Sequence, residues 1–168
     1  MSRIEIVDYD AHWPEKFQRH ASIIAEALGD AVLQIEHIGS TSVPGLGAKP
    51  IIDILLLVEN SRNEASYLPQ LEAAGYELRV REPDFHEHRM FRTPERDVQV
   101  HVYASTSPEI ERHLIFRDRL RSNVDERQLY DDTKRKLARQ PWADMNAYAE
   151  AKTPIIERII ANARASSG

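Results

Sequence analysis

The segment from His37 to Val58, HIGSTSVPGLGAKPIIDILLLV, constrains the fold more than any other part of the chain. Its second half, residues 51–58, is rich in Leu and β-branched residues, which is typical of a buried strand. Its first half is rich in Gly, Ser and Thr and contains Pro44, which leaves room for one short helical turn at most. The segment therefore predicts a polar loop that leads directly into a core strand.

One acidic residue, Asp53, interrupts the apolar run. An ionised carboxylate in a buried strand is costly unless it has a partner. The preceding loop offers backbone N–H groups, the hydroxyls of Ser40 and Thr41, and the ammonium of Lys49, and such groups suit an anion such as phosphate. A phosphate-binding loop beside a strand-borne acid is what a nucleotide or phosphoester site needs. Two structural alternatives stay open: the hydroxyls could cap a turn, and Lys49 could pair with Asp53.

The rest of the chain predicts an α+β fold. Helices are expected at about 13–28, 62–74, 107–122, 124–139 and 143–164, the last with a break at Thr153-Pro154. Strands are expected at about 32–38, 50–58, 76–81, 86–93 and 97–103, and residues 4–7 form a short strand or an extended lead-in. This order favours a mixed sheet of about five strands with flanking helices and a helical C-terminal subregion.

Composition narrows the class of protein. A chain of 168 residues suits one domain, 1–168, and its tail at about 164–168 is expected to be frayed. Lys and Arg number 22 against 27 for Asp and Glu, a balance that makes nucleic acid an unlikely partner. The absence of Cys excludes disulfides and Cys-ligated metal sites. No apolar run resembles a signal peptide or a membrane span, so we expect a cytoplasmic protein without a membrane partner.

Three motifs resemble the GrpB family, a branch of the nucleotidyltransferase superfamily. They are HIGSTSVPGLGAKPIIDI (37–54), VHVY (100–103) and FRDRLRSN (116–123), and the resemblance extends over roughly residues 4–162. It implies the nucleotidyltransferase fold, in agreement with the α+β pattern. Similar domains occur fused to dephospho-CoA kinase, but no G-x-x-x-x-G-K-[ST] motif is present here, so kinase activity of that type is not expected.

The resemblance also implies a metal-binding pattern, which this chain keeps only in part. The superfamily has a Gly-Ser pair, then two acids one residue apart on a strand, and a third acid on a neighbouring strand; together the acids hold Mg²⁺. Here Gly39-Ser40 and Asp53 match, Leu55 stands at the second acid, and His101 falls at the third. A His–Asp pair would suit Zn²⁺ or Mn²⁺ better than Mg²⁺.

His86 and His88 add a second candidate for metal binding. On the expected strand 86–93 both imidazoles would point to one face, followed there by Arg92, and with His101 they could converge on Asp53. A short His-x-His pattern alone is weak evidence, and hydrogen-bonding or surface histidines are the commoner explanation.

Further cations could bind phosphate. His37 precedes the loop, where it could contact phosphate or satisfy the loop backbone. Arg117 and Arg121 lie four apart on one helix face and could grip a phosphate, or pair with nearby Asp residues instead. Lys134 could extend this face toward the cleft, and Arg92 is a further candidate from the expected hairpin.

Two functions are open at this stage. The first is an enzyme that binds a nucleotide or another phosphorylated small molecule and transfers a nucleotidyl or phosphoryl group. In it, Asp53 holds a divalent metal (Mg, Mn or Zn), His101 is a second ligand or the general base, and Lys49 acts with Arg117 on the phosphate. The second is a catalytically degenerate module that binds a nucleotide or a protein.

Overall fold

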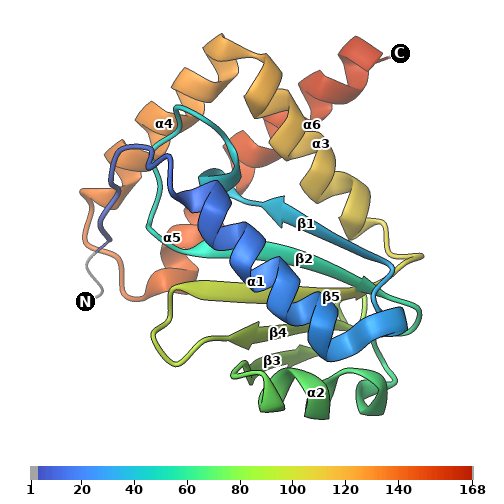
Figure 1. Ribbon diagram of the computed structural model, residues 1–168. Helices are drawn as coiled ribbons and strands as arrows, with labels where there is room; N and C mark the ends of the chain where they lie inside the picture. The colour runs from blue at the N-terminus through green and yellow to red at the C-terminus, as the bar shows by residue number, and fades with distance from the viewer. Residues whose placement is uncertain (1–3, 168) are drawn as a thin grey trace.

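The computed structural model describes residues 4–167, whose strands form one mixed sheet (Figure 1). Its five strands lie in the order β1-β2-β5-β4-β3. The central pair β2 and β5 is parallel, and the other neighbours are antiparallel. The strand bounds are β1 Gln34–Ile38, β2 Ile52–Val58, β3 Glu77–Glu82, β4 His88–Arg92 and β5 Val98–Ala104. The α+β fold with a mixed sheet is confirmed.

The helices divide between the two faces of this sheet. One face carries α1 and α2, whereas α3, α4, α5 and α6 form a group at the β1 side and behind the sheet (Figure 1). Short 3₁₀ turns occupy Gly29–Ala31, Ser40–Ser42 and Glu64–Ser66. The helix bounds are α1 Trp13–Leu28, α2 Leu68–Ala73, α3 Glu109–Ser122, α4 Val124–Ala138, α5 Met145–Ala151 and α6 Thr153–Ser167.

The alternation along β5 decides which face becomes core. Val98, Val100 and Val102 are fully buried in the main apolar cluster, which α1 and α2 cover. Because successive residues of a strand point to opposite faces, Gln99 and His101 point to the other face. The parallel register places Asp53 of β2 beside Gln99 on that second face. The polar residues of the two central strands therefore share one side of the sheet.

The helical C-terminal region packs against this second face and against the loop that follows β1. Leu55, Leu57 and Tyr103 form a small apolar cluster with Ile110 and Leu114 of α3. A further cluster joins the loop to the helices through Val43, Leu46, Leu120, Tyr130 and Ile159. The loop is thus held between the sheet and the helical region.

Several boundaries differ from the expected ones. The helix expected at 62–74 is replaced by the 3₁₀ turn Glu64–Ser66 and the short helix α2. Pro69 lies in the first turn of α2, a position that proline favours. The frayed tail is wrong for residues 164–167, since α6 continues to Ser167 and Arg164 lies 3.5 Å from Glu111. Val7 forms one antiparallel bridge with Ala48, so residues 4–7 are a lead-in rather than a strand of the sheet. Residues 1–3 and 168 of the expected domain lie outside the described part.

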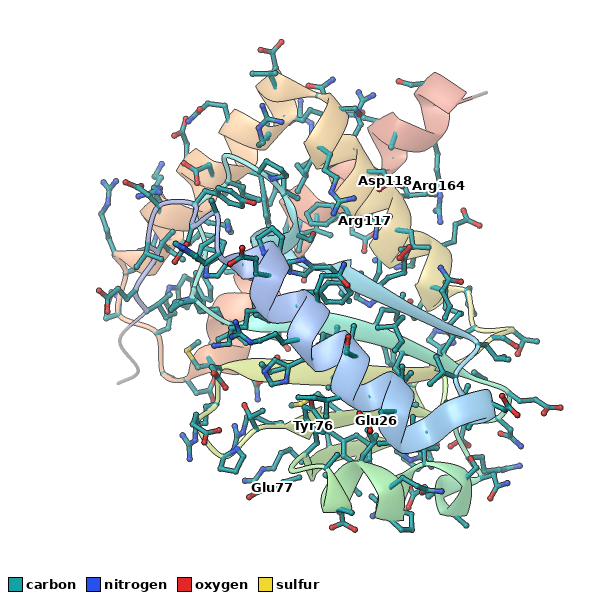
Figure 2. All side chains as sticks on the ribbon, in the orientation of Figure 1. Glu26, Tyr76, Glu77, Arg117, Asp118 and Arg164 are labelled. Carbon is teal, nitrogen blue, oxygen red and sulfur yellow. The ribbon has the colours of Figure 1, made fainter. Side chains whose placement is uncertain are left out.

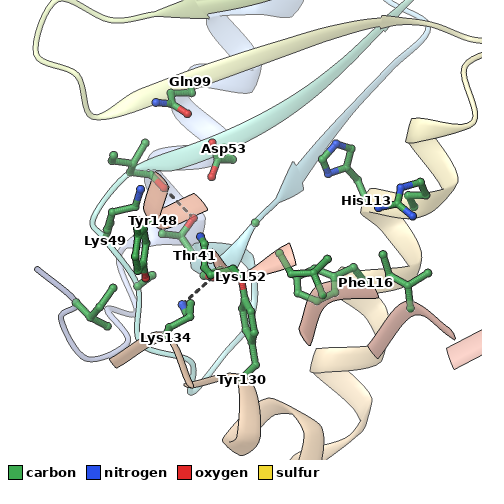
Figure 3. Close-up of a pocket in the computed structure, with 18 of the residues that line it drawn as sticks. Thr41, Lys49, Asp53, Gln99, His113, Phe116, Tyr130, Lys134, Tyr148 and Lys152 are labelled. Atoms are coloured by element: carbon green, nitrogen blue, oxygen red, sulfur yellow. Dashed lines mark hydrogen bonds between the residues drawn. The ribbon is translucent and has the colours of Figure 1, made fainter. Parts of the chain in front are cut away.

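The break expected at Thr153-Pro154 is confirmed, because α5 ends at Ala151 and α6 begins at Thr153. The change of direction there brings Tyr148 of α5 and Lys152 close to the sheet (Figure 3). Within residues 4–167, no helix has both the length and the apolar character needed to cross a membrane.

Candidate phosphate-binding site

A cavity of about 250 Å³ opens between the second face of the sheet and the C-terminal helices (Figure 3). Its walls come from the loop after β1, from β2 and β5, and from all four C-terminal helices. Six of the site residues that the sequence predicted line this one cavity: Gly39, Ser40, Thr41, Lys49, Asp53 and Lys134. Residues nearly a hundred positions apart in the sequence thus meet at one place.

Gly39 sets the approach of the loop to Asp53. Its φ of 74° is in the left-handed region, which favours glycine. A Cβ at this position would lie 2.7 Å from Asp53 Oδ2, too close for any other residue without a shift. The glycine of the motif therefore lets the loop backbone pass directly over the carboxylate.

The loop hydroxyls are used in different ways. Ser42 Oγ donates to the carbonyl of Gly39, and Thr41 Oγ1 lies 2.9 Å from His37 Nε2. The Ser42 contact fits the turn-capping alternative, whereas the Thr41 contact joins the loop to the side chain of His37. Ser40 is different, because its Oγ accepts a hydrogen bond of 2.8 Å from Lys134 Nζ in the cavity wall.

Three lysines face the cavity: Lys49, Lys134 and Lys152. Among residues 4–167, none of them has a carboxylate oxygen within 4.0 Å, so the expected Lys49–Asp53 pair is not formed as an ion pair. Burial lowers the pKa of Lys134 to about 7 and that of Lys152 to about 8, and in both cases a neighbouring lysine adds to the effect. Burial also lowers the pKa of Lys49, while Asp53 opposes that shift. Anionic ligands would relieve this accumulation of positive charge.

Two tyrosines stand against these lysines. The Nζ atoms of Lys49 and Lys152 lie 5.5 and 4.8 Å from the ring centroid of Tyr148, and Lys134 Nζ lies 5.0 Å from that of Tyr130. Such cation–π contacts stabilise a buried ammonium without neutralising it. Tyr148 is fully buried, and its hydroxyl has no hydrogen-bond partner among residues 4–167. Nothing in the sequence identified Tyr148 or Lys152 as site residues. The nearest signal was the helix break predicted at Thr153.

Asp53 ends a row of hydrogen-bonded side chains on the second face. Its Oδ1 lies 3.1 Å from His101 Nε2, and His101 Nδ1 lies 3.1 Å from His88 Nε2. His88 Nδ1 in turn lies 2.6 Å from Glu82 Oε1. Both ring nitrogens of each histidine therefore have protein partners, which explains their place on the strand without a bound metal.

His86 does not join this row. It lies in a turn with φ of 53°, and β4 begins only at His88. Its Nε2 is 3.7 Å from Glu109 Oε1 instead. The predicted strand 86–93 is therefore too long at its start, and the expected convergence of three imidazoles on Asp53 is wrong.

The donor set does not fit the magnesium site that the resemblance implied. Leu55 is fully buried at the second acid position, and Gln99 lies opposite Asp53 on β5. Among residues 4–167 there is no group of three or more His, Asp or Glu that could hold a metal ion. Asp53 and His101 supply two donors that bond to each other, whereas Mg²⁺ requires octahedral oxygen ligands.

The remaining predicted residues lie elsewhere. His37, Arg117 and Arg121 line a second cavity of about 550 Å³ together with Arg127. Arg117 Nη1 donates to the carbonyl of His37 (3.2 Å), and its Nε lies 2.8 Å from Asp118 Oδ1 (Figure 2). Arg121 Nε donates to the carbonyl of Ser42 (2.9 Å). The structure therefore does not bring Arg117 together with Lys49.

Two other residues predicted to bind phosphate, His37 and Arg92, do not lie at the lysine cavity. The His37 ring stacks on Phe17 with 4.8 Å between centroids, and burial lowers its pKa to about 4. The His37 imidazole is therefore neutral at pH 7 and carries no charge that would attract phosphate. Arg92 lies on β4 opposite Gln99 and lines neither cavity.

Comparison with known proteins assigns the family. A sequence profile described as GrpB protein matches residues 3–162. The chain belongs to the GrpB family. It is 50% identical over 163 residues to a UPF0157 protein of Halalkalibacterium halodurans, which covers 97% of this chain and 84% of that relative. The crystal structure of conserved protein GrpB from Enterococcus faecalis is 35% identical, with a TM-score of 0.84 over 95% of this chain and 96% of that one.

More distant matches concern the fold. The structure of Cid1 in complex with its short product ApU matches with a TM-score of 0.54 and 13% identity, over 77% of this chain and 42% of that chain. The fold of this GrpB protein is therefore nucleotidyltransferase-like, as the sequence predicted. A dephospho-CoA kinase of Mycolicibacterium paratuberculosis is 28% identical over 177 residues, which cover 90% of this chain and 44% of that protein.

Proposed function

We propose that this GrpB protein binds a nucleotide or another phosphorylated small molecule in the cavity that Lys49, Lys134 and Lys152 line. The observation that carries the proposal is the meeting of three lysines around one cavity, none of which forms an ion pair with a carboxylate among residues 4–167. Unpaired buried cations are costly, and an anionic ligand would offset that cost. Ser40 and the backbone of the turn at Ser40–Ser42 add polar groups beside them.

A transferase is one form of this function. Asp53 favours it, because this carboxylate lines the cavity and, with His101 Nε2 at 3.1 Å from its Oδ1, can accept a proton as a general base. His101 contacts Asp53 but does not line the cavity itself. The chemistry would be nucleotidyl or phosphoryl transfer, and these residues would move the proton of the acceptor.

A binding module is the second form. With Leu55 at the second acid position and His101 at the third, Asp53 is the one acid of the expected three, which disfavours a two-metal transfer. The match to dephospho-CoA kinase covers less than half of that protein, which fits a domain that supports a separate catalytic unit.

Calorimetric titration with ATP, GTP and CTP, each with and without Mg²⁺ and Mn²⁺, tests the proposal. We expect binding that Lys49→Ala weakens by about tenfold, since one charge-assisted contact is lost. Lys136→Ala is the matched control, because Lys136 is exposed on α4 and outside the cavity. Binding that requires metal and is lost in Asp53→Asn would favour the transferase. No binding of any of the three nucleotides contradicts their use as ligands.

A further inference from the structure

We propose that Tyr148 and Lys152 form, with Lys49, a metal-independent subsite for the dianion of a phosphate ester. This inference rests on the proposed function of the same cavity and names the groups that recognise the ligand. It assigns a ligand-binding role to the junction of α5 and α6, which lies about a hundred residues from the motif loop in the sequence. Figure 3 shows both residues beside Lys49.

The first step is the balance of charge in the cavity. Three lysines and one carboxylate, Asp53, line the cavity, and since the pKa of Lys134 is about 7 this lysine is only partly ionised at neutral pH. The surplus there is therefore between one and two positive charges. Glu109 and Arg112 also line the cavity, but they lie 3.3 Å apart and cancel each other. A phosphate monoester carries close to two negative charges near neutral pH and so matches the surplus.

Second, Lys49 and Lys152 differ from Lys134 in how their ammonium groups are used. Lys134 Nζ already donates to Ser40 Oγ and to the carbonyl of Gly47, so it holds the loop in place. Among residues 4–167, no hydrogen bond or ion pair occupies the ammonium of Lys49 or of Lys152; each meets the face of the Tyr148 ring. Each can therefore turn its donors toward an anion while keeping its aromatic contact.

The third step is the Tyr148 hydroxyl. The residue is fully buried and lines the cavity, and within the described part of the chain its hydroxyl lacks a hydrogen-bond partner. A buried hydroxyl without a partner is costly, so such groups are uncommon in folded proteins. A phosphate oxygen is an acceptor and would take this hydrogen bond. The Tyr148 ring contacts the ammonium groups of both Lys49 and Lys152, so its unsatisfied hydroxyl adds a third donor to the same wall of the cavity.

The fourth step concerns the metal. Among residues 4–167 there is no cluster of acids and histidines for a metal ion at this wall, since Asp53 contacts His101 and Glu109 pairs with Arg112. The lysines supply the positive charge in its place. Asp53 then repels the phosphate rather than recruiting it through a metal, and this reverses the expected effect of Asp53→Asn.

The test measures binding of inorganic phosphate and of AMP to the full chain at pH 7, in EDTA and again with Mg²⁺. We expect similar affinity in both conditions, a loss of about tenfold or more in Lys152→Met, and a loss of about fivefold in Tyr148→Phe. Asp53→Asn should tighten binding severalfold, because a like charge is removed. Lys136→Met serves as the control and should bind as the unaltered protein does.

The outcomes separate this inference from the proposed function. Binding that needs Mg²⁺ and disappears in Asp53→Asn would overturn the metal-independent subsite and leave the proposed function standing. Binding that survives Lys152→Met and Tyr148→Phe but not Lys49→Ala would do the same. Absence of any binding by the unaltered protein would overturn both. Tyr148→Phe should retain its melting temperature, since the hydroxyl has no partner to lose, so a loss of affinity in a folded variant is interpretable.

Discussion

Two clusters of basic side chains lie on either side of the loop after β1, and they differ in how their charges are satisfied. On one side, Lys49 and Lys152 have no ion-pair partner among residues 4–167 and face a cavity. On the other side, Arg117 donates to the carbonyl of His37 at the end of β1, Arg121 donates to the carbonyl of Ser42 in the loop, and both lie near Asp118. The lysines are available to a ligand, whereas the arginines are already engaged.

This difference follows from the chemistry of the two side chains. A guanidinium presents several donors in a fixed plane, so Arg117 and Arg121 can hold the carbonyls of His37 and Ser42 at defined positions. An ammonium is a compact charge on a long stem, and it can move toward an arriving anion. The FRDRLRSN motif therefore holds β1 and the loop through their carbonyls, while lysines from three different segments line the cavity.

The largest effect is expected where the loop touches both clusters. Gly39→Ala should lower the free energy of unfolding by about 3 kcal/mol, since φ is positive and the new Cβ would meet Asp53. Urea unfolding measures it. Gly29→Ala is the matched control: its φ is 56° but nothing lies within 4 Å, so we expect a cost of about 1 kcal/mol. Equal costs would mean that the contact with Asp53 contributes nothing.

The second largest effect on stability is expected for Arg117. Arg117→Met should lower the free energy of unfolding by about 2 kcal/mol, because the carbonyl of His37 loses its donor and the ion pairs with Glu36 and Asp118 are removed. Phosphate affinity should fall by less than about threefold, as Arg117 lies outside the lysine cavity. Arg158→Met, at an exposed position of α6, is the control. A tenfold loss of affinity at unchanged stability would instead place Arg117 at the ligand.

Much of the architecture could be predicted from local patterns. The alternation in β5 and the apolar run of β2 identified the two central strands, and Pro154 marked the start of α6. The loop and Asp53 were placed in one site because they are close in sequence. His86 was misplaced, since a turn with positive φ ends the His-x-His pattern and periodicity does not register it.

Tertiary packing decided the rest. Nothing near Tyr148 or Lys152 in the sequence points to a ligand, and their role depends on how α5 folds back onto the loop. Arg117 and Lys49 seemed equivalent as cations, yet the loop lies between their cavities. A sequence shows which charges are present but does not show which of them the fold has already paired.

The smallest effect is expected in the lysine cluster, with the opposite sign to that of Arg117→Met. Lys152→Met should stabilise the ligand-free protein by about 1 kcal/mol at pH 7, because it removes a partly buried charge that has no ion pair among residues 4–167. Burial lowers the pKa of Lys152 to about 8 from 10.5, so below pH 8 the lysine is charged in both states and the penalty is complete. Between pH 8 and 10.5 the unfolded chain binds more protons than the folded chain, so the stability of the folded protein rises with pH.

The gain from Lys152→Met should therefore shrink between pH 8 and 10.5 and vanish above that range. Thermal melts across this interval measure it, with Lys136→Met as the exposed control. If Lys152→Met destabilised the protein at pH 7, Lys152 would have a structural role like that of Arg117, and the two clusters would not differ as described. If Lys152→Met instead stabilises the protein and weakens phosphate binding, Lys152 lowers the stability of the folded chain but raises its affinity for phosphate. That combination is expected of a binding residue and not of a structural contact.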